Sequence, residues 1–384
     1  MNEFGDLHSR ADNGEVEAEL AVGEAYELGN GVLQDYAEAI RWYRQAAEQN
    51  SSAAALNLGY MYASGRGVAK DHAEANRWFR TAADQGNLDA QLTLAGSYAT
   101  GSGVRQDTTE AVRWYRKAAE QGSIQAQLYL GWAYSSGIGV PSDRSEAVRW
   151  YSRAAASGSA SAQSNVGLMY ASGAGVPKNE GEAVEWFRKA ADQGNADGEY
   201  NLGVMYANGR GVEKNDPEAG KWYRKAADHG SADGAFDLGS MYYSGRGVEK
   251  DETAALKWWR RAAELGSPAA QYKIGNLFAT GGGIPKDPVE AAKWYRMAAG
   301  LGHIDAQASL GDLYVKGEGV EKDGVEGLAY FIIAASSGQD YASRTRLIYI
   351  KRLGPELAQK AKNRADVIGQ EIEAKKARLA AAPP

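Results

Sequence analysis

The feature that most constrains this chain is a unit of 36 residues that occurs nine times. Nine glycines from Gly29 to Gly317 keep this step, and each opens a Gly-x-Gly-Val/Ile loop. Aromatic residues follow the same step at Trp42, Trp78, Trp114, Trp150, Trp186, Trp222, Trp258, Trp294 and Tyr330. Nine copies of one unit indicate a repeat array, which buries its core between neighbouring units and presents one long surface. A binding role is therefore the first function to consider.

Residues 123–158 show what one unit folds into. Ala126, Leu130 and Tyr134 recur at helical spacing, which predicts a first helix over about 123–135. The loop glycine suits the left-handed position after a helix end. Asp143, followed three residues later by Glu146, predicts a capping box that starts a second helix. Each unit is thus expected to be a helix-turn-helix.

The Trp of each unit is expected to be its anchor, because burying an indole removes about 150–250 Å² from water. An aromatic stripe can also line a ligand box, but its recurrence in every unit favours a core. Some units differ in their small residues: Gly198 and Gly234 replace the Ala of the first helix, and Gly220 lies inside a second helix. Since an interior Gly costs about 1 kcal/mol relative to Ala, residues 195–240 are predicted to be the softest part.

Composition and motifs exclude several functional classes. The net charge is −6, which argues against general binding to nucleic acid. There is no cysteine for a disulfide or a metal site, and no apolar run long enough to span a membrane. The histidines His8, His72, His229 and His303 show no metal-ligand spacing, and the glycine loops follow helices and lack a third glycine. The sequence predicts no catalytic, cofactor-binding or metal-binding residue.

The unit resembles the Sel-one-like repeat, a branch of the tetratricopeptide superfamily. In the second unit the matching residues are Ala54, Leu58, Gly59, Tyr62, Gly65, Gly67, Val68, Asp71, Ala75, Trp78, Phe79, Ala82, Ala83 and Gly86. The resemblance implies an all-α, right-handed α-solenoid of about nine helix pairs, with the first helices lining a concave groove. We expect a half-repeat at 1–14, nine repeats at 15–338 and a helical cap at 339–384.

The two ends leave alternatives open. Leu7 to Gly14 looks like the second half of a unit, so the chain begins with a half-repeat cap or lacks upstream residues. A removed signal sequence would place the protein in a bacterial periplasm or cell envelope, and otherwise the cytoplasm is expected. At the other end, an apolar stripe after Pro355 predicts one helix, which is a cap on repeat 9 or a membrane-surface or partner helix: Leu357, Ala361, Ala365, Ile368, Ile372 and Leu379.

Candidate binding residues lie on the first helices, on the face that the resemblance turns toward the groove. Two rows of equivalent positions define this first-helix face. The Tyr60 row is Glu24, Tyr60, Gly96, Trp132, Leu168, Val204, Ser240, Asn276 and Asp312. The Tyr129 row is Ala21, Asn57, Thr93, Tyr129, Asn165, Asn201, Asp237, Lys273 and Ser309.

Apolar groups that stacking does not require suggest a contact, and Asn can hydrogen-bond a peptide backbone through both donor and acceptor. The predicted groove residues are Tyr60, Tyr129, Trp132, Asn165, Leu168, Asn201 and Val204. Alternatively, these side chains pack on one another across repeats. Several carboxylates make the later part of this face acidic, which favours a basic partner or is a solvated surface: Asp197, Asp233, Asp237, Asp305 and Asp312.

The leading hypothesis is a monomeric, non-enzymatic adaptor that binds a protein or peptide in the groove. The alternative is a cell-envelope hydrolase that acts on β-lactam or peptidoglycan fragments, since cysteine-rich secreted members of the resembled family have β-lactam-related activity. This chain lacks their cysteines. A third possibility is a structural spacer without a binding site.

Overall fold

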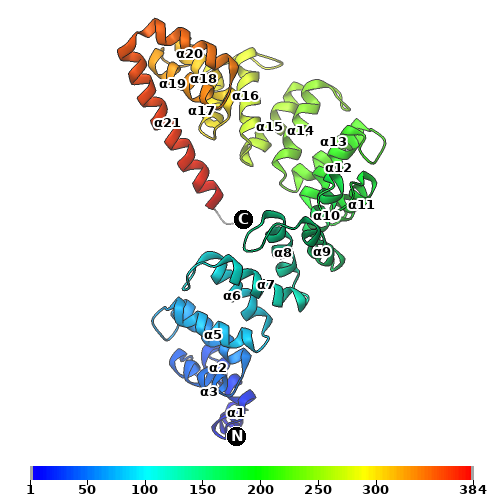
Figure 1. The fold of residues 1–384 in the computed structure, drawn as a ribbon, viewed down its shortest axis with the longest axis vertical. Helices are drawn as coiled ribbons and strands as arrows, with labels where there is room; N and C mark the ends of the chain where they lie inside the picture. The colour runs from blue at the N-terminus through cyan, green and yellow to red at the C-terminus, as the bar shows by residue number, and fades with distance from the viewer. Residues whose placement is uncertain (1–2, 382–384) are drawn as a thin grey trace. The chain divides into compact units, whose positions relative to one another are not determined.

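The chain is an all-α solenoid of paired helices. The computed structural model describes residues 3–381, which form 21 helices and no strand (Figure 1). The first helices of the nine repeats are α2 (Val16–Leu28), α4 (Ser52–Ser64), α6 (Leu88–Thr100), α8 (Ile124–Ser136), α10 (Ala160–Ser172), α12 (Ala196–Asn208), α14 (Ala232–Ser244), α16 (Pro268–Thr280) and α18 (Ile304–Lys316).

The second helices follow after each glycine loop. They are α3 (Tyr36–Glu48), α5 (His72–Asp84), α7 (Thr108–Glu120), α9 (Arg144–Ala156), α11 (Glu180–Ala191), α13 (Asp216–Asp228), α15 (Glu252–Glu264), α17 (Pro288–Ala299) and α19 (Gly324–Ser336). One helix precedes the repeats and two follow them: α1 (Glu3–Asp12), α20 (Asp340–Leu353) and α21 (Pro355–Ala381).

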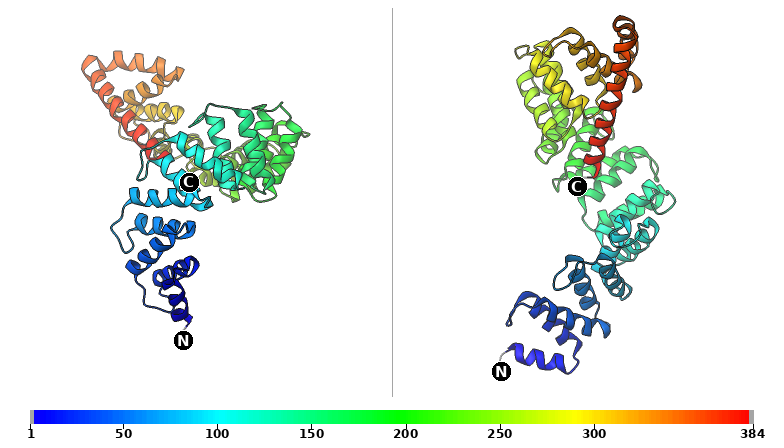
Figure 2. Two further views of the ribbon diagram at one scale, coloured as in Figure 1. Left: turned by 60° about the horizontal axis from the view of Figure 1, so that its bottom comes forward. Right: turned by 90° about the vertical axis from the view of Figure 1, so that its left-hand side faces the viewer.

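The chain divides into two compact units, unit 1 (Met1–Asn179) and unit 2 (Glu180–Pro384). Within each unit, every helix packs on the helix before it and the helix after it, as the two views of Figure 2 also show. Repeats 1–4 and 6–9 therefore each contribute one hairpin to the unit that contains them, whereas repeat 5 contributes α10 to unit 1 and α11 to unit 2.

The main anchor of each repeat is the aromatic residue after the Trp. This second aromatic is buried in all nine repeats, with 0–8% of its surface exposed. Trp42, Trp114 and Trp150 are also buried, but the Trp is half-buried in the other five repeats. The expectation that the Trp is the anchor is therefore wrong as a general rule. The nine anchors are Tyr43, Phe79, Tyr115, Tyr151, Phe187, Tyr223, Trp259, Tyr295 and Phe331.

In seven of the nine repeats the second aromatic lies against a glycine of the first helix in the same repeat. A Cβ atom on Gly59 would lie 2.5 Å from the Phe79 ring, and one on Gly131 would lie 2.5 Å from Tyr151. The surroundings of the Trp vary more, and in four repeats a Lys or Arg three residues later lies over its ring. The Lys117 ammonium, for example, lies 3.9 Å from the Trp114 ring centroid. The glycine thus lets the ring of the second aromatic approach the helix backbone, which explains why this ring is buried in these seven repeats.

The two glycines of each loop have different tasks. Gly137 ends α8 with φ 72°, and its N–H donates to the Ala133 carbonyl, which confirms the predicted left-handed cap. Gly139 also has a positive φ of 73° and abuts the backbone of α7 in the preceding repeat. A Cβ there would lie 2.3 Å from the Thr108 carbonyl oxygen. The second glycine therefore sets how closely consecutive repeats approach.

Seven of the second helices begin with an aspartate cap, and α13 begins with Asn215 instead. In α9 the capping box is incomplete. The Asp143 carboxylate accepts from the N–H groups of Ser145 and Glu146 at 2.9 and 3.0 Å. The predicted return bond from Glu146 is not made, because the Asp143 N–H already donates to the Tyr134 carbonyl at 2.9 Å. Glu146 pairs instead with Arg149 at 3.1 Å. The cap prediction is right for the aspartate and wrong for the glutamate.

The glycines at 198 and 234 permit close helix packing. A Cβ on Gly198 would lie 2.5 Å from the Ala190 Cβ, and one on Gly234 would lie 2.8 Å from the Ala226 Cβ. Close contact between α12 and α11, and between α14 and α13, accompanies these two glycines. The softness expected for residues 195–240 stays a prediction, but packing supplies another reason for glycine at both positions.

A buried polar position joins consecutive repeats. The Gln91 amide donates to the Ala83 carbonyl at 3.2 Å and accepts from Gln121 at 2.8 Å. Where a carboxylate takes this position, its partner comes from the end of the same repeat. Glu199 is 1% exposed and lies 2.8 Å from the His229 Nδ1. The stacking of repeats is thus compatible with either an amide or a carboxylate at this position.

The C-terminal segment contains two helices where the sequence predicted one. Helix α20 starts at the position of a tenth first helix, and α21 carries the predicted stripe. Ala365, Ile368 and Ile372 of α21 are buried in a cluster with residues of α17, α18 and α19. The stripe does not continue to the end, since Leu379 is 60% exposed.

We predict that Gly139→Ala destabilises the protein more than Gly137→Ala does. Both substitutions place Ala at a positive φ, which costs about 1–2 kcal/mol. Only Gly139→Ala also forces a methyl group against the backbone of Thr108. The atom nearest to a Cβ on Gly137 is 3.4 Å away. Chemical denaturation of both variants measures the difference, and equal losses would contradict the close-approach role of the second glycine.

We predict that removing residues 354–384 lowers the melting temperature and promotes self-association. This truncation uncovers the apolar side of repeats 8 and 9, on which Ile368 and Ile372 pack. A matched truncation of 377–384, which begins at the exposed residues 377–379, should leave melting unchanged. Unchanged melting and sedimentation after the longer truncation would favour a free interaction helix instead of a cap.

We predict that His303 makes stability depend on pH. Its Nδ1 accepts from the Ala306 N–H at 3.2 Å, and its ring stacks on Tyr272 at 4.6 Å. Burial lowers the pKa of His303 below 6.5, while Asp305 opposes this effect and Lys273 adds to it. The neutral ring is the one that caps α18, so this stabilisation is present above pH 6.5 and is lost as the pH falls through the lowered pKa.

The His303→Asn variant tests this prediction, because Asn caps α6 and α12 at the equivalent position. Between pH 7.5 and pH 5.5, the melting temperature of the wild-type protein should decrease by more than that of the variant. Parallel losses in the two proteins would show that other groups carry the pH dependence.

Candidate functional site: the first-helix face

Five of the predicted groove residues lie in unit 1, on α4, α8 and α10. Asn201 and Val204 lie on α12, in unit 2, so the structure brings together only Tyr60, Tyr129, Trp132, Asn165 and Leu168. Tyr60, Trp132 and Leu168 each keep close to half of their surface exposed, at 45%, 44% and 45%. Large apolar side chains therefore stand on the first-helix face at the predicted positions.

Trp132 is supported from behind by two tyrosines. Its ring centroid lies 5.4 Å from that of Tyr129, and Tyr129 stacks on Tyr115 at 3.8 Å. Tyr115 is buried and Tyr129 half-buried, and burial raises the pKa of both phenols. The rings connect the exposed indole to the core, so Trp132 has limited freedom to move.

Tyr60 is held in a similar way. Its ring meets Phe79 edge-on at 5.2 Å, and its hydroxyl lies 3.3 Å from the Thr93 Oγ1 on the next first helix. On α10, Asn165 is half-buried and Leu168 is exposed. The Tyr60 row of unit 1 thus presents apolar side chains on three of its five first helices.

In unit 2 the two predicted residues make local contacts. The Asn201 Nδ2 donates to the Asp197 carbonyl at 2.8 Å, one turn earlier on its own helix. Val204 is half-buried against a cluster that includes Ala207 and Tyr223. These contacts agree with the alternative of local packing at Asn201 and Val204.

The acidic positions of unit 2 fall into two groups. Asp197, Asp233 and Asp305 are exposed. Asp237 lies 3.3 Å from the Tyr200 hydroxyl, which donates to it, and burial raises the pKa of this carboxyl group. Asp312 accepts from the Tyr341 hydroxyl at 2.7 Å. Two of the five carboxylates are therefore engaged in pairs with tyrosines.

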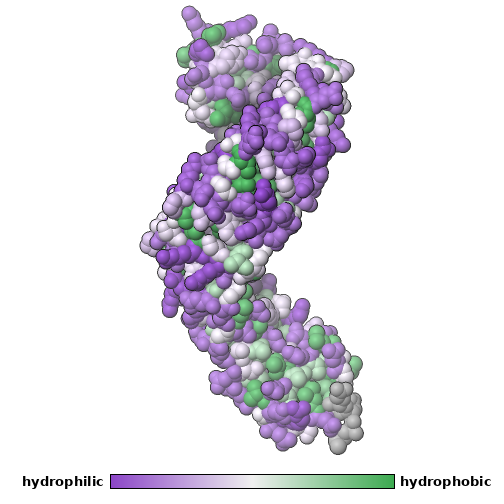
Figure 3. Space-filling view, turned by 90° about the vertical axis from the view of Figure 1, so that its right-hand side faces the viewer, coloured by the Kyte–Doolittle hydropathy of each residue, from purple (hydrophilic) through white to green (hydrophobic). Residues whose placement is uncertain are grey.

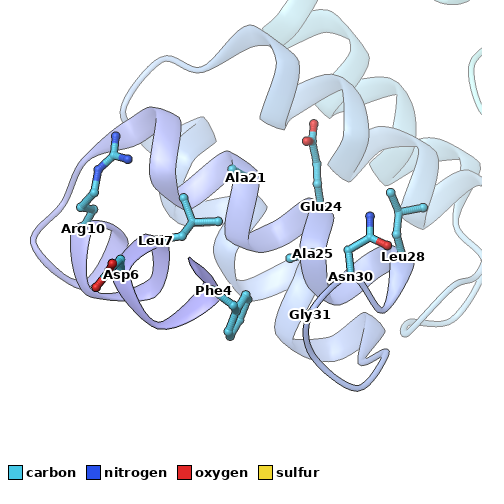
Figure 4. A pocket seen from close by; sticks show the side chains of 10 residues that line it. All are labelled: Phe4, Asp6, Leu7, Arg10, Ala21, Glu24, Ala25, Leu28, Asn30 and Gly31. Atoms are coloured by element: carbon cyan, nitrogen blue, oxygen red, sulfur yellow. The ribbon is translucent and has the colours of Figure 1, made fainter. Parts of the chain in front are cut away.

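Sequence reasoning missed a cavity of about 640 Å³ between α1 and α2. Figure 4 shows Arg10 on α1 and Glu24 on α2 at its two sides, with Leu7 between them. The signal was present in the repeat phase, since Leu7 stands where other units have the second aromatic and Arg10 where they have Ala. Arg10 pairs with Glu15, with a distance of 2.7 Å from Nε to Oε2. Asp6, Arg10 and Glu24 give this cavity a charged lining.

In residues 3–381, no group of three His, Asp or Glu side chains is placed to hold a metal ion. No helix in this part of the chain has the length and apolarity needed to cross a membrane. Figure 3 shows separate apolar patches amid hydrophilic surface on the face that it views.

A family model described as the Sel1 repeat matches nine consecutive segments of the chain. The matched residues are 16–51, 52–87, 88–123, 124–159, 160–195, 196–231, 232–267, 268–303 and 304–339.

The chain belongs to the Sel1 repeat family.

Solved structures of other Sel1 repeat proteins agree with this assignment. A Sel1 repeat protein from Oxalobacter formigenes is 35% identical over 82% of this chain and 90% of its own, with a TM-score of 0.68. The protective antigen c5321 of uropathogenic Escherichia coli strains, which has the SLR fold, is 31% identical over 100% of this chain and 98% of its own, with a TM-score of 0.53. A search of curated proteins found no match. Sel1 repeats commonly form protein-interaction scaffolds.

Proposed function

We propose that this Sel1 repeat protein is an adaptor whose first-helix face in unit 1 binds an extended segment of another protein. The observation that carries the proposal is Trp132, which is 44% exposed although it belongs to a connected set of rings. It is outside the repeating Trp series, so the stacking of repeats does not account for it. Because Trp132 lies on the first-helix face, contact with a partner is the best explanation for its exposed side chain.

The surroundings of Trp132 favour a peptide-like partner. Tyr129 supports the indole, and Leu168 continues the row on α10. Clustered aromatic residues that are backed by packed neighbours are typical of interface hot spots, because little ordering entropy is lost on binding. The polar side chains of this face, such as Thr93 and Asn165, are suited to hydrogen bonds with a peptide backbone.

Asn201 and Val204 are proposed as part of the adaptor surface of unit 2, as a separate set. Their local contacts make them weaker candidates than Trp132. Substitutions in unit 2 therefore need to be assayed independently of those in unit 1.

We predict that Trp132→Ala weakens binding of the partner by about 2 kcal/mol or more and leaves the fold largely stable. Trp150→Ala is the matched control, because Trp150 is 4% exposed and lies in the core. That variant should destabilise the protein by about 3–5 kcal/mol. Thermal melts and calorimetric titration with the partner, recovered by affinity capture, measure both effects.

Two outcomes would contradict the proposal. Normal binding by Trp132→Ala would remove Trp132 from the interface, and a loss of stability as large as that of Trp150→Ala would place it in the core. Turnover of nitrocefin by the purified wild-type protein would instead support the alternative of a β-lactam hydrolase.

A further inference from the structure

We propose that the space beside Gly96 receives one bulky apolar side chain of the bound segment, and that a Lys or Arg about five or six residues away reaches Glu24. This inference rests on the proposed function, since it names the chemistry of the segment that unit 1 binds. It specifies an extended segment with one large apolar residue, one distant basic residue and no acidic residue between them.

The space exists because repeat 3 reverses a pair of residues. Every other repeat has Gly followed by a larger residue here, as in Gly59-Tyr60 and Gly131-Trp132, and repeat 3 has Ala95-Gly96. Ala95 is fully buried, so it takes the inward position that Gly has elsewhere. The reversal leaves the Tyr60 row without a side chain on α6, between the exposed rings of Tyr60 and Trp132.

The space beside Gly96, called here the Gly96 gap, is open and has aromatic surroundings. A Cβ atom on Gly96 would have the Tyr115 hydroxyl as its nearest neighbour, at 4.0 Å. Toward α4, the Tyr60 hydroxyl reaches Thr93, one turn before Gly96. Toward α8, Tyr115 stacks on Tyr129, which contacts Trp132. A ring or branched aliphatic side chain in the gap would therefore contact packed aromatic residues on both sides.

The charges on the first helices of unit 1 define the rest of the segment. These five helices carry five carboxylates and no Lys or Arg: Glu17, Glu19, Glu24, Glu27 and Asp89. Two of them have partners, since Glu19 accepts from Gln49, and Glu27 accepts from Tyr43 and forms an ion pair with Arg66. Glu24 is exposed and has no ion pair among the described residues. A basic segment is thus favoured and an acidic one is repelled.

The distance between the two contacts follows from helix spacing. Glu24 stands in the same row as Gly96, two repeats earlier along unit 1. Neighbouring first helices touch through side chains, as the Tyr60 hydroxyl and the Thr93 Oγ1 do at 3.3 Å. At the spacing of helices in contact, about 8–10 Å, two repeats span about 16–20 Å. An extended chain covers about 3.3 Å per residue, which gives a separation of about five or six residues.

The test is selection from a random dodecapeptide library displayed on phage, with the whole protein as bait. We expect enrichment of peptides that combine Trp, Phe, Leu or Met with a Lys or Arg about five or six residues away. A synthetic peptide of the enriched sequence is then titrated calorimetrically into the wild type and the variants. Enrichment of acidic peptides, or no enrichment at all, would overturn the inference.

Two substitutions of one residue give a matched pair. Gly96→Leu fills the gap and should weaken the peptide at least tenfold, whereas Gly96→Ala leaves most of the space and should bind like the wild type. Both residues are better helix formers than Gly, so neither variant should melt below the wild type. If Gly96→Leu melts lower, Gly96→Gln takes its place as a second, flexible filling residue. Glu24→Gln should weaken binding several-fold at low salt and flatten its salt dependence.

The variants separate this inference from the proposed function. A peptide that is lost on Trp132→Ala but binds Gly96→Leu normally would overturn the Gly96 gap and keep the adaptor face. A peptide that is insensitive to both substitutions would overturn both. Titration with a second copy of the protein as ligand, monitored by sedimentation, should show no association, and a dimer that Gly96→Leu disrupts would assign the gap to self-association instead.

Discussion

The structure depends on the contact between a ring of the second helix and a glycine of the first helix. In seven repeats of the described chain a Cβ on this glycine would lie 3.0 Å or less from the ring, as with Gly59 and Phe79. The ring is thereby buried within its own repeat, and the hairpin becomes a unit that can be stacked. The Trp is half-buried in five repeats and buried in three, and Trp114 and Trp150 are slightly less exposed than the second aromatic beside them. The contact with the glycine explains why the second aromatic is buried in these seven repeats while the burial of the Trp varies.

The same contact fixes what the next residue can do. Because the glycine lies on the side of the helix that faces the buried ring, the next residue lies on the first-helix face. That residue is free to vary from repeat to repeat. Tyr60, Trp132 and Leu168 occupy this position with large exposed side chains in unit 1. In repeat 3 the order is reversed, so that Ala95 is buried and Gly96 takes the outer position. The residue after the glycine varies while the contact between the glycine and the ring is kept. The protein can therefore change which partner this surface binds without changing its fold.

Polar residues between repeats follow a similar rule. The buried Gln91 both donates and accepts, and it therefore joins the Ala83 carbonyl of the preceding repeat to Gln121 at the end of its own repeat. A carboxylate at this position can only accept, and Glu19 and Glu199 lie against Gln49 and His229 of their own repeats. These contacts matter because a buried carboxylate without a donor would be costly.

The sequence by itself determined the repeat, the helix pairs, the left-handed glycine caps and the aspartate caps, because these depend on local backbone geometry and spacing. It also placed Tyr60, Trp132 and Leu168 on an exposed face. Only the tertiary structure decided which aromatic is the anchor, since both rings have the same period and differ only in what they meet. It likewise showed that Glu146 pairs with Arg149. The Asp143 N–H group, which Glu146 was expected to accept from, donates to the Tyr134 carbonyl instead. At Gly198 the sequence indicated softness, whereas a Cβ atom there would lie only 2.5 Å from the Ala190 Cβ, which indicates close packing. Contacts between helices are set by neighbours distant in the sequence, and a local pattern does not contain them.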